Sequence, residues 1–365
     1  MKCVKIILGI FKWIFIVLIS LVLLIFIVRF IGQQINKLTP SGGINEEMYI
    51  DINGTKQWIS IYGRDKSNPV MLYVHGGPGI ATSGFDYPVL RKLADDYTVV
   101  NWDQRGAGKS QMKYPFDGYV TPELLREDIY EVTKYVLDKT GKEKLTVLGS
   151  SWGTLYGGDF ALSHPELVEC YIGTSQVVDY QDIYIRLKES ALEWSKDDAE
   201  FHKLVESYDP LVFSQEEIDK STAIRKKYCQ NDNILKDGDL NILAAMFFNP
   251  YYSLKDLYGY IKVFASGKMP SAYEKFIYDA SQEKPRIGGI QDFSLKARTE
   301  YPMPVYIRTG NKDYQSNPDQ PKEYFDMITA PDKEFEYVDG GHFLPFIDSE
   351  GLAVFVHKVR ERSAS

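Results

Sequence analysis

Residues 145–153 spell LTVLGSSWG, an apolar run that ends in a serine pair between glycines. The run 145–148 predicts a buried strand, and residues 152–163 predict a helix directly after it. Gly149-Ser150-Ser151-Trp152-Gly153 fits the pattern Gly-x-Ser-x-Gly, in which a sharp strand-to-helix turn exposes the serine above a sheet. Glycines on both sides permit the close backbone approach that such a turn needs. The register makes Ser151, and not Ser150, the candidate nucleophile.

Strands and helices alternate on both sides of this turn. Thr121 followed by Pro122 begins a helix, and Gly141 ends it. The alternation predicts an α/β fold with a mostly parallel sheet flanked by helices. Further strand-like runs lie at 48–52, 57–62, 70–74, 97–102, 168–172, 303–308 and 334–338, and a terminal helix is expected over about 350–360.

The block 179–296 interrupts this alternation. It contains amphipathic helical segments, many aromatic residues and no clear strand. We expect it to form a helical cap inserted between the two parts of the sheet domain, residues 48–178 and 297–365. Because such sheets bind ligands outside the carboxyl ends of their strands, the cap is expected to cover the binding site.

The amino-terminal segment 6–30 is apolar except for Gly9, Lys12, Ser20 and Arg29. A helix needs about 20 such residues to cross a bilayer, and basic side chains near its ends can reach the headgroups. The sequence therefore predicts one membrane-spanning helix in this segment.

This membrane anchor is predicted over residues 1–31, and the polar stretch 32–47 is predicted to be a linker between the membrane and the sheet domain. A cleaved secretory signal would end in a small-x-small site, which the residues RFIGQQ at 29–34 do not resemble. More basic residues precede or open the helix than follow it, so we expect a cytoplasmic amino terminus and an extracytoplasmic domain.

The overall composition is that of a globular protein with an acidic surface. The chain has 365 residues, 50 of them acidic and 42 basic, which argues against nucleic acid as a partner. Its cysteines, Cys3, Cys170 and Cys229, are odd in number and lack the spacing of a zinc site. We therefore expect no disulfide framework, no metal and no cofactor.

A serine hydroxyl is a poor nucleophile, so an imidazole must take its proton and a carboxylate must orient that imidazole. In folds with this turn, the acid and then the histidine follow the serine in the chain. His342, in the motif GGHF after the last predicted strand, is the candidate base, and Asp313, in TGNKD after the strand before it, is the candidate acid. Asp319 and Asp339 are alternatives to Asp313. The remaining histidines after the serine lie close behind its helix, in the cap and in the terminal helix: His164, His202 and His357.

The motif HGGPG at 75–79 follows the predicted strand 70–74. Backbone N–H groups must approach a developing oxyanion closely, and glycine permits this because it has no β-carbon. We assign the oxyanion hole to the amides of Gly77 and Trp152, and we expect His75 to hold its loop by a local hydrogen bond.

These motifs together resemble the prolyl aminopeptidase, or proline iminopeptidase, family of α/β-hydrolases. The resemblance rests on HGGPG at 75–79, WDQRG at 102–106, GSSWG at 149–153 and Gly-His at 341–342. It implies the α/β-hydrolase fold and a triad of Ser151, Asp313 and His342. In this family, acids and a Trp-Glu element of the cap hold the substrate's amino group. No such element can be aligned here, and the candidates are the acids around Trp194, namely Glu189, Glu193 and Glu200.

The resemblance implies a serine hydrolase that acts by acyl transfer on a small peptide or ester. The first hypothesis is an aminopeptidase that releases small amino-terminal residues such as proline. The second is an esterase or lipase-like enzyme for apolar esters, and the third is a non-catalytic membrane receptor or scaffold. Aromatic residues of the cap could line either enzyme's pocket: Phe247, Phe248, Tyr251 and Tyr252.

Overall fold

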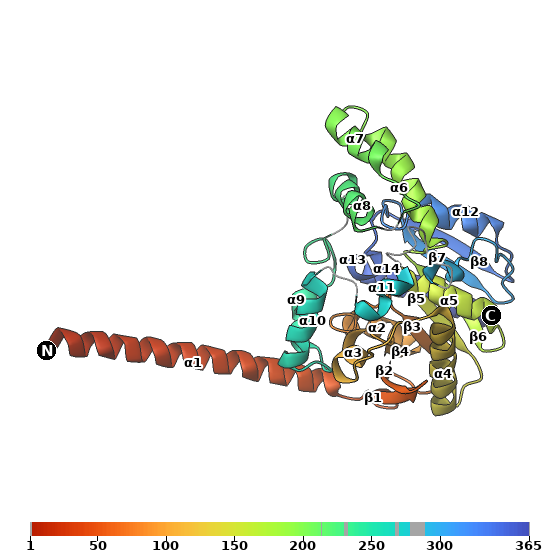
Figure 1. The fold of residues 1–365 in the computed structure, drawn as a ribbon. Helices are drawn as coiled ribbons and strands as arrows, with labels where there is room; N and C mark the ends of the chain where they lie inside the picture. The colour runs from red at the N-terminus through yellow and green to blue at the C-terminus, as the bar shows by residue number, and fades with distance from the viewer. Residues whose placement is uncertain (1, 213, 230–232, 267–269, 278–288, 365) are drawn as a thin grey trace.

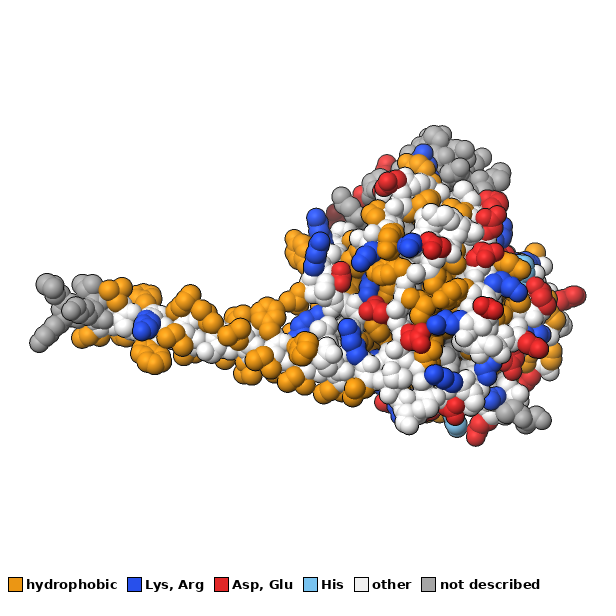
Figure 2. All heavy atoms as spheres, turned by 90° about the horizontal axis from the view of Figure 1, so that it is seen from below, with side chains coloured by type: hydrophobic (Ala, Val, Ile, Leu, Met, Phe, Trp, Pro, Cys, Tyr) orange, Lys and Arg blue, Asp and Glu red, His pale blue; other side chains and the backbone are white. Residues whose placement is uncertain are grey.

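The computed structural model describes residues 2–212, 214–229, 233–266, 270–277 and 289–364. Helices surround a central sheet, and one long helix, α1 (Lys2–Lys37), projects from this body (Figure 1). Seen from below, the projecting part of α1 is covered mainly by apolar side chains (Figure 2).

The sheet has eight strands in the order β1-β2-β4-β3-β5-β6-β7-β8. β1 and β2 pair antiparallel, β2 pairs antiparallel with β4, and every later neighbour in this order is parallel. The prediction of a mostly parallel sheet is therefore confirmed. The strands are β1 (Ile44–Ile52), β2 (Thr55–Gly63), β3 (Val70–Val74), β4 (Thr98–Asp103), β5 (Leu145–Ser150), β6 (Val168–Thr174), β7 (Val305–Gly310) and β8 (Lys333–Val338).

Helices connect the parallel strands or follow the sheet. The connecting and terminal helices are α2 (Tyr87–Lys92), η1 (Leu93–Asp95), α3 (Gly108–Lys113), α4 (Pro122–Thr140), α5 (Trp152–Ser163), α12 (Asp319–Met327), α13 (Leu344–Ile347) and α14 (Ser349–Ala364). Those between β6 and β7 are α6 (Tyr180–Trp194), α7 (Ala199–Ser207), α8 (Gln215–Tyr228), α9 (Ile242–Phe248), α10 (Leu254–Ser266), α11 (Ser271–Ile277) and η2 (Ile290–Phe293).

Strand β3 shows why both faces of the sheet are covered. Its alternate residues Val70, Leu72 and Val74 belong to one apolar core, whereas Met71 and Tyr73 belong to the other. Successive side chains of a strand point to opposite faces, so a strand buried on both faces is a continuous apolar run. Helices α4 and α5 contribute to the first core, and α2 and α14 contribute to the second.

The boundaries of α4 follow from local chemistry. Thr121 caps its first turn by accepting a hydrogen bond from the Leu124 N–H at 3.2 Å, and Pro122 takes the first helical position, where no N–H is needed. Gly141 ends the helix in the left-handed conformation, with φ of 65°. These are the start and stop residues that the sequence predicts.

The block predicted as a cap contains helices α6 to α11. Part of it has its own small apolar cluster, in which Leu187 and Ala191 of α6 pack with Val205 of α7 and Ile224 of α8. Figure 1 shows α6 and α8 beside the end of the sheet at which β5 and β7 terminate. This placement brings cap side chains to the turn that follows β5.

The stretch 32–47 differs from the predicted linker. It is helical up to Lys37, and β1 begins at Ile44, so few residues separate α1 from the sheet. The end of α1 also packs on the body. Arg29 is 4% exposed and donates to the Tyr252 carbonyl at 2.8 Å, and Gln33 donates to the Asn249 carbonyl at 2.7 Å. Gln33, in the polar stretch predicted to be a linker, thus binds a carbonyl of the loop after α9.

Candidate active site

Ser151 occupies the sharp turn between β5 and α5, with φ of 53° and ψ of −123°. This backbone conformation is rare for a residue with a side chain and is held only where the surroundings impose it. A β-carbon on Gly153 would overlap the Val74 carbonyl oxygen, and one on Gly149 would lie 2.6 Å from the Gly153 carbonyl oxygen. Both glycines are therefore required for the turn, and the turn presents Ser151 to the cap.

His342 lies between Ser151 and Asp313. Its Nε2 is 2.8 Å from the Ser151 Oγ, and its Nδ1 is 2.9 Å from Oδ2 and 3.0 Å from Oδ1 of Asp313. The His342 side chain is 5% exposed and the Asp313 side chain is fully buried. Because a carboxylate accepts the Nδ1 proton, Nε2 is left to accept the serine hydroxyl proton.

The carboxylate of Asp313 is fully hydrogen-bonded. Besides His342, it accepts from the Ser316 hydroxyl at 2.6 Å and from the backbone N–H groups of Ser316 and Gln315 at 3.0 and 3.1 Å. Burial acts to raise the pKa of Asp313, but the charge and hydrogen bond of His342 and the Ser316 hydrogen bonds outweigh it and lower this pKa. Asp313 is thus kept ionised beside the imidazole.

The alternative acids lie elsewhere. Asp339 is exposed and forms an ion pair with Lys312 at 2.6 Å, and Asp319 begins α12, where its N–H donates to Asn317. The other histidines named as less suitable candidates have partners of their own away from Ser151. His164 pairs with Glu166, His202 with Ser195 and His357 with Asp96.

The HGGPG loop passes directly over the serine turn. A β-carbon on Gly76 would lie 3.1 Å from the Ser151 Cβ, so only glycine permits this approach without displacement. Gly77 and Trp152, the residues predicted for the oxyanion hole, both line the cavity that contains Ser151 and His342. The Trp152 amide belongs to the first turn of α5, where N–H groups have no partner within the helix.

Gln104 connects the HGGPG loop to Trp152, a role not predicted from the sequence. Its side chain donates to the His75 carbonyl at 3.1 Å and accepts from the Trp152 indole N–H at 3.2 Å. The His75 Nδ1 lies 2.7 Å from the Gly76 carbonyl, and its Nε2 accepts the Gln104 N–H at 3.2 Å. Burial lowers the pKa of His75 to about 4, so this imidazole is neutral and holds the loop, as expected from the sequence. Only the WDQRG motif at 102–106 could have indicated Gln104.

The cavity at Ser151 has a volume of about 140 Å³ and is bounded by the cap. Tyr180, Ile183 and Tyr184 of α6 line it together with Arg225 of α8. The hydroxyls of Tyr180 and Tyr184 lie 3.0 Å apart. The cap therefore contributes a polar, cationic wall to a small cavity above the serine.

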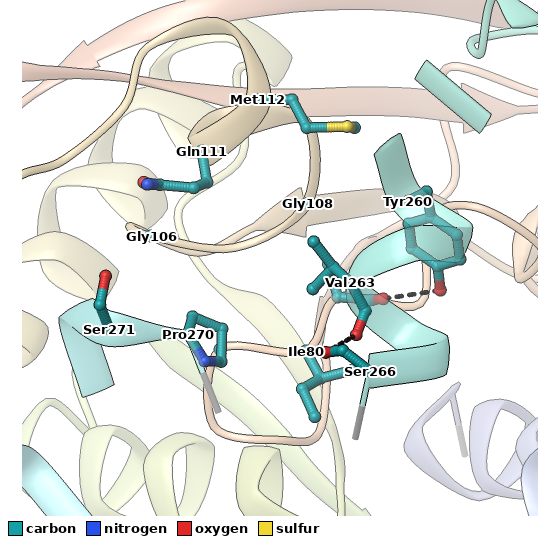
Figure 3. Close-up of a pocket in the computed structure, with 12 residues that line it drawn as sticks. Ile80, Gly106, Gly108, Gln111, Met112, Tyr260, Val263, Ser266, Pro270 and Ser271 are labelled. Atoms are coloured by element: carbon teal, nitrogen blue, oxygen red, sulfur yellow. Dashed lines mark hydrogen bonds between the residues drawn. The ribbon is translucent and has the colours of Figure 1, made fainter. Parts of the chain in front are cut away.

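A second, larger and more apolar cavity is lined by Gly79 of the HGGPG loop. It has a volume of about 280 Å³ and is lined by Ile80, Met112, Tyr260, Val263 and Pro270, among others (Figure 3). The Tyr260 hydroxyl closes one side by donating to the Ala81 carbonyl at 2.9 Å. Neither Ser151 nor His342 lines this cavity, so it is not the site of the triad residues.

The cap residues named from the sequence as candidates for substrate binding do not line the cavity at Ser151. Glu189, Glu193 and Glu200 are exposed on α6 and α7. Phe247 and Phe248 belong to α9, where Arg29 lies over the Phe247 ring and Phe248 packs on Gly32 of α1. Tyr251 and Tyr252 are buried among the loops behind α9. These aromatic residues serve the packing of the cap and of α1.

The fold and the serine turn define an α/β-hydrolase. The chain belongs to the α/β-hydrolase fold family, which it matches over residues 69–349, and the predicted fold is thereby confirmed. A probable aminopeptidase of Bacillus subtilis is 38% identical over 133 residues, which are 36% of this chain and 42% of that protein. A proline iminopeptidase of Heyndrickxia coagulans is 29% identical over 130 residues, 35% of this chain and 42% of that protein. The chain thus matches less than half the length of these curated relatives.

Solved structures agree on the fold. The crystal structure of a proline iminopeptidase from Mycobacterium smegmatis superposes with a TM-score of 0.57 at 17% identity, over 87% of this chain and 98% of that chain. A proline iminopeptidase-related protein from Thermus thermophilus gives a TM-score of 0.55 at 18% identity, over 88% of this chain and 98% of that chain. These structures show the fold, and the curated relatives from Bacillus subtilis and Heyndrickxia coagulans confirm the resemblance to prolyl aminopeptidases found in the sequence.

Proposed function

We propose that this protein is a serine hydrolase that acts by acyl transfer. Ser151 attacks a carbonyl carbon, and His342 takes the hydroxyl proton and returns it to the leaving group. Asp313 orients the imidazole, and the amides of Gly77 and Trp152 stabilise the oxyanion. Water then releases the acyl group by the same steps. The observation that carries this proposal is the continuous hydrogen-bonded series from Ser151 through His342 to Asp313.

The bond that is hydrolysed is proposed to be an amide next to an amino-terminal residue. The names of the relatives support an aminopeptidase that releases small residues such as proline, and the small volume of the cavity, about 140 Å³, suits a small residue. The second candidate is an esterase of apolar esters. The apolar cavity of about 280 Å³ favours it, because both this cavity and the cavity at Ser151 are lined by residues of the HGGPG loop, and an apolar part of an ester could occupy the larger one.

A fluorophosphonate probe, which labels activated serines, tests the proposed mechanism. Ser151→Ala should abolish both labelling and turnover of p-nitrophenyl acetate, whereas Ser150→Ala should retain labelling, because Ser150 is the last residue of β5. Labelling of the Ser151→Ala protein would reject Ser151 as the nucleophile. Failure of the unmodified protein to react with either reagent would favour the non-catalytic receptor or scaffold.

We further propose that α1 anchors the protein in a membrane. Its large apolar side chains from Ile6 to Phe30 are 38% to 67% exposed, which is unfavourable in water and suits lipid. The buried contacts of Arg29 and Gln33 with the loop after α9 support a retained helix over a cleaved signal. The basic residues at its start support a cytoplasmic amino terminus. Protease added to intact cells would then remove the hydrolase domain, and full protection would contradict this orientation.

A further inference from the structure

Arg225 is the cation of the cavity above Ser151, and the catalytic steps proposed above do not use it. It lies in the cap, in the last turn of α8. It lines the same cavity as Ser151, His342 and Gly77, the residue whose backbone N–H is assigned to the oxyanion hole. Figure 1 shows α8 above the sheet, beside α6. When a substrate carbonyl lies at Ser151, the Arg225 side chain is therefore close to the substrate groups next to that carbonyl.

The guanidinium of Arg225 has no counter-ion among the residues that the structure describes. Its Nε is buried and forms no hydrogen bond there, and the residues three and four positions away on the chain, Ser221, Thr222, Tyr228 and Cys229, are not acidic. Two other cations of α8 form ion pairs: Lys220 with Glu216 and Glu217, and Lys227 with Asp198.

Tyr184 holds the guanidinium by its face. The Arg225 Cζ lies 4.8 Å from the centroid of the Tyr184 ring, within the range of a cation–π contact. A cation–π contact uses none of the N–H groups of the guanidinium, so they are left to hydrogen-bond with a ligand. A guanidinium edge matches a carboxylate, which it binds by two parallel hydrogen bonds.

The nearby carboxylate of the catalytic residues is not available to Arg225. Asp313 uses both of its oxygens for His342, Ser316 and Gln315. A partly buried charge without a partner is costly, and a substrate anion would remove that cost when it binds. The cavity thus has the charge and the geometry to select an acidic substrate.

We infer that Arg225 binds a carboxylate of the substrate, and that the protein hydrolyses small molecules with a free carboxylate near the scissile carbonyl, such as dipeptides. This inference rests on the proposed serine hydrolase function. It sets the substrate class of that same site, because a cavity of about 140 Å³ leaves little room between the serine and the guanidinium. A peptide that continues beyond the second residue would place a neutral amide where the carboxylate belongs.

Matched substrate pairs that differ only in this charge test the inference on the full-length protein. One pair is the dipeptide Pro-Ala and its carboxamide, and the other is p-nitrophenyl hydrogen glutarate and its methyl ester. We expect kcat/KM to be higher for the charged member of at least one pair by about 10- to 100-fold, mainly through KM, since hydrogen bonds to charged groups contribute on this scale. Equal kcat/KM within both pairs would overturn the inference.

Variants then assign the preference to Arg225. Arg225→Met should reduce the ratio of the two kcat/KM values towards one, and Arg225→Lys should restore part of it, because lysine keeps the charge without the fork. Arg186→Met is the matched control. Arg186 also belongs to the cap, but it pairs with Asp182 and Glu323 and does not line the cavity, so the ratio should not change.

The fluorophosphonate probe separates the possible failures. Labelling of each variant at Ser151 shows an intact site, and Arg225→Gln takes the place of Arg225→Met if the latter does not fold. If the Arg225 variants are labelled and the ratio of kcat/KM values within each substrate pair does not change, the role of Arg225 is wrong and the proposed function stands. No labelling of the unmodified protein would overturn the proposed function itself.

Discussion

The Nδ1 of His342 lies 2.9 Å from Oδ2 and 3.0 Å from Oδ1 of Asp313, so one buried carboxylate holds the ring that faces Ser151. Asparagine at position 313 would keep the shape but could donate to Nδ1 and leave the proton on Nε2. We expect Asp313→Asn to lower kcat by about 10³- to 10⁴-fold with little change in the melting temperature. Steady-state hydrolysis of p-nitrophenyl acetate measures the loss.

Asp339→Asn is the control for this experiment, because Asp339 is exposed and pairs with Lys312 instead of His342. Its activity should equal that of the unmodified protein. If the Asp313 variant stayed fully active and the Asp339 variant did not, the orienting role would move to Asp339.

Buried Asp86 should make stability depend on pH. Burial raises the pKa of Asp86 to about 7, and the nearby Asp103 contributes to the rise. In the window between the ordinary carboxyl pKa and about 7, the folded protein retains a proton that the unfolded chain has released. The free energy of unfolding therefore falls as the pH rises through this window.

Asp86→Asn removes this titration while retaining a carbonyl oxygen that can accept from Asn101, its partner at 2.8 Å. As the pH rises from about 5 to about 8, the melting temperature should decrease less in this variant than in the unmodified protein. The side chain of Asp51 is 80% exposed, so the Asp51→Asn variant should show the same pH dependence of the melting temperature as the unmodified protein. An identical pH dependence in the Asp86 variant would show that Asp86 does not titrate in this range.

The end of α1 belongs to the folded domain, so the position of a truncation matters. Deleting residues 1–27 leaves Arg29, Gln33 and Asn36 in place, whereas deleting residues 1–36 removes their hydrogen bonds to the end of α9 and the loop after it. Buried hydrogen bonds contribute about 1 kcal/mol each, and we expect the shorter chain to melt several degrees lower. Thermal scans in mild detergent compare the two chains. Equal melting temperatures would mean that the polar stretch acts only as a tether.

The sequence predicts the sheet well because the strong signals are local. The strand β3 is recognised by its own apolar run, and the ends of α4 are recognised by Thr121, Pro122 and Gly141. Each of these signals depends only on residues that are adjacent in the chain. The serine turn is equally local, since the crowding of Gly149 and Gly153 depends on neighbouring backbone. The positions of residues 75–79 and 341–342 in the fold could also be predicted, because each segment follows a recognisable strand.

Contacts between distant segments could not be predicted in the same way. Arg29 and Gln33 look like the flank of a membrane helix, and their carbonyl partners lie more than 200 residues away in the chain. Arg225 looks like one of several basic residues on the surface of α8, and only the fold shows that it lines the cavity of Ser151. Cap helices have weak sequence signals for function because their position over the sheet, and not their own pattern, decides which face meets the substrate.

The amino group of the substrate separates the aminopeptidase from the esterase. A cationic amine shielded from water needs a carboxylate partner, because an unpaired buried charge is costly. The described residues that line the cavity at Ser151 include no acid, so in an aminopeptidase this partner would have to lie outside that lining. We expect an amide of proline or another small residue to be hydrolysed when its amino terminus is free, and kcat/KM to fall by about 10-fold or more when that amine is acetylated. Release of the free amino acid, measured by chromatography, follows the reaction.

Glu189, Glu193 and Glu200 provide a check on how the amine is held. All three are exposed and none lines the cavity at Ser151, so their replacement by glutamine should leave the amine dependence unchanged. Loss of that dependence in the glutamine variants would instead give these carboxylates the amine-binding role. If the unmodified protein hydrolyses short acyl esters and treats free and acetylated amides alike, no amine is recognised at all. The esterase would then be the better description, because a pocket for apolar esters gains nothing from a charged amino terminus.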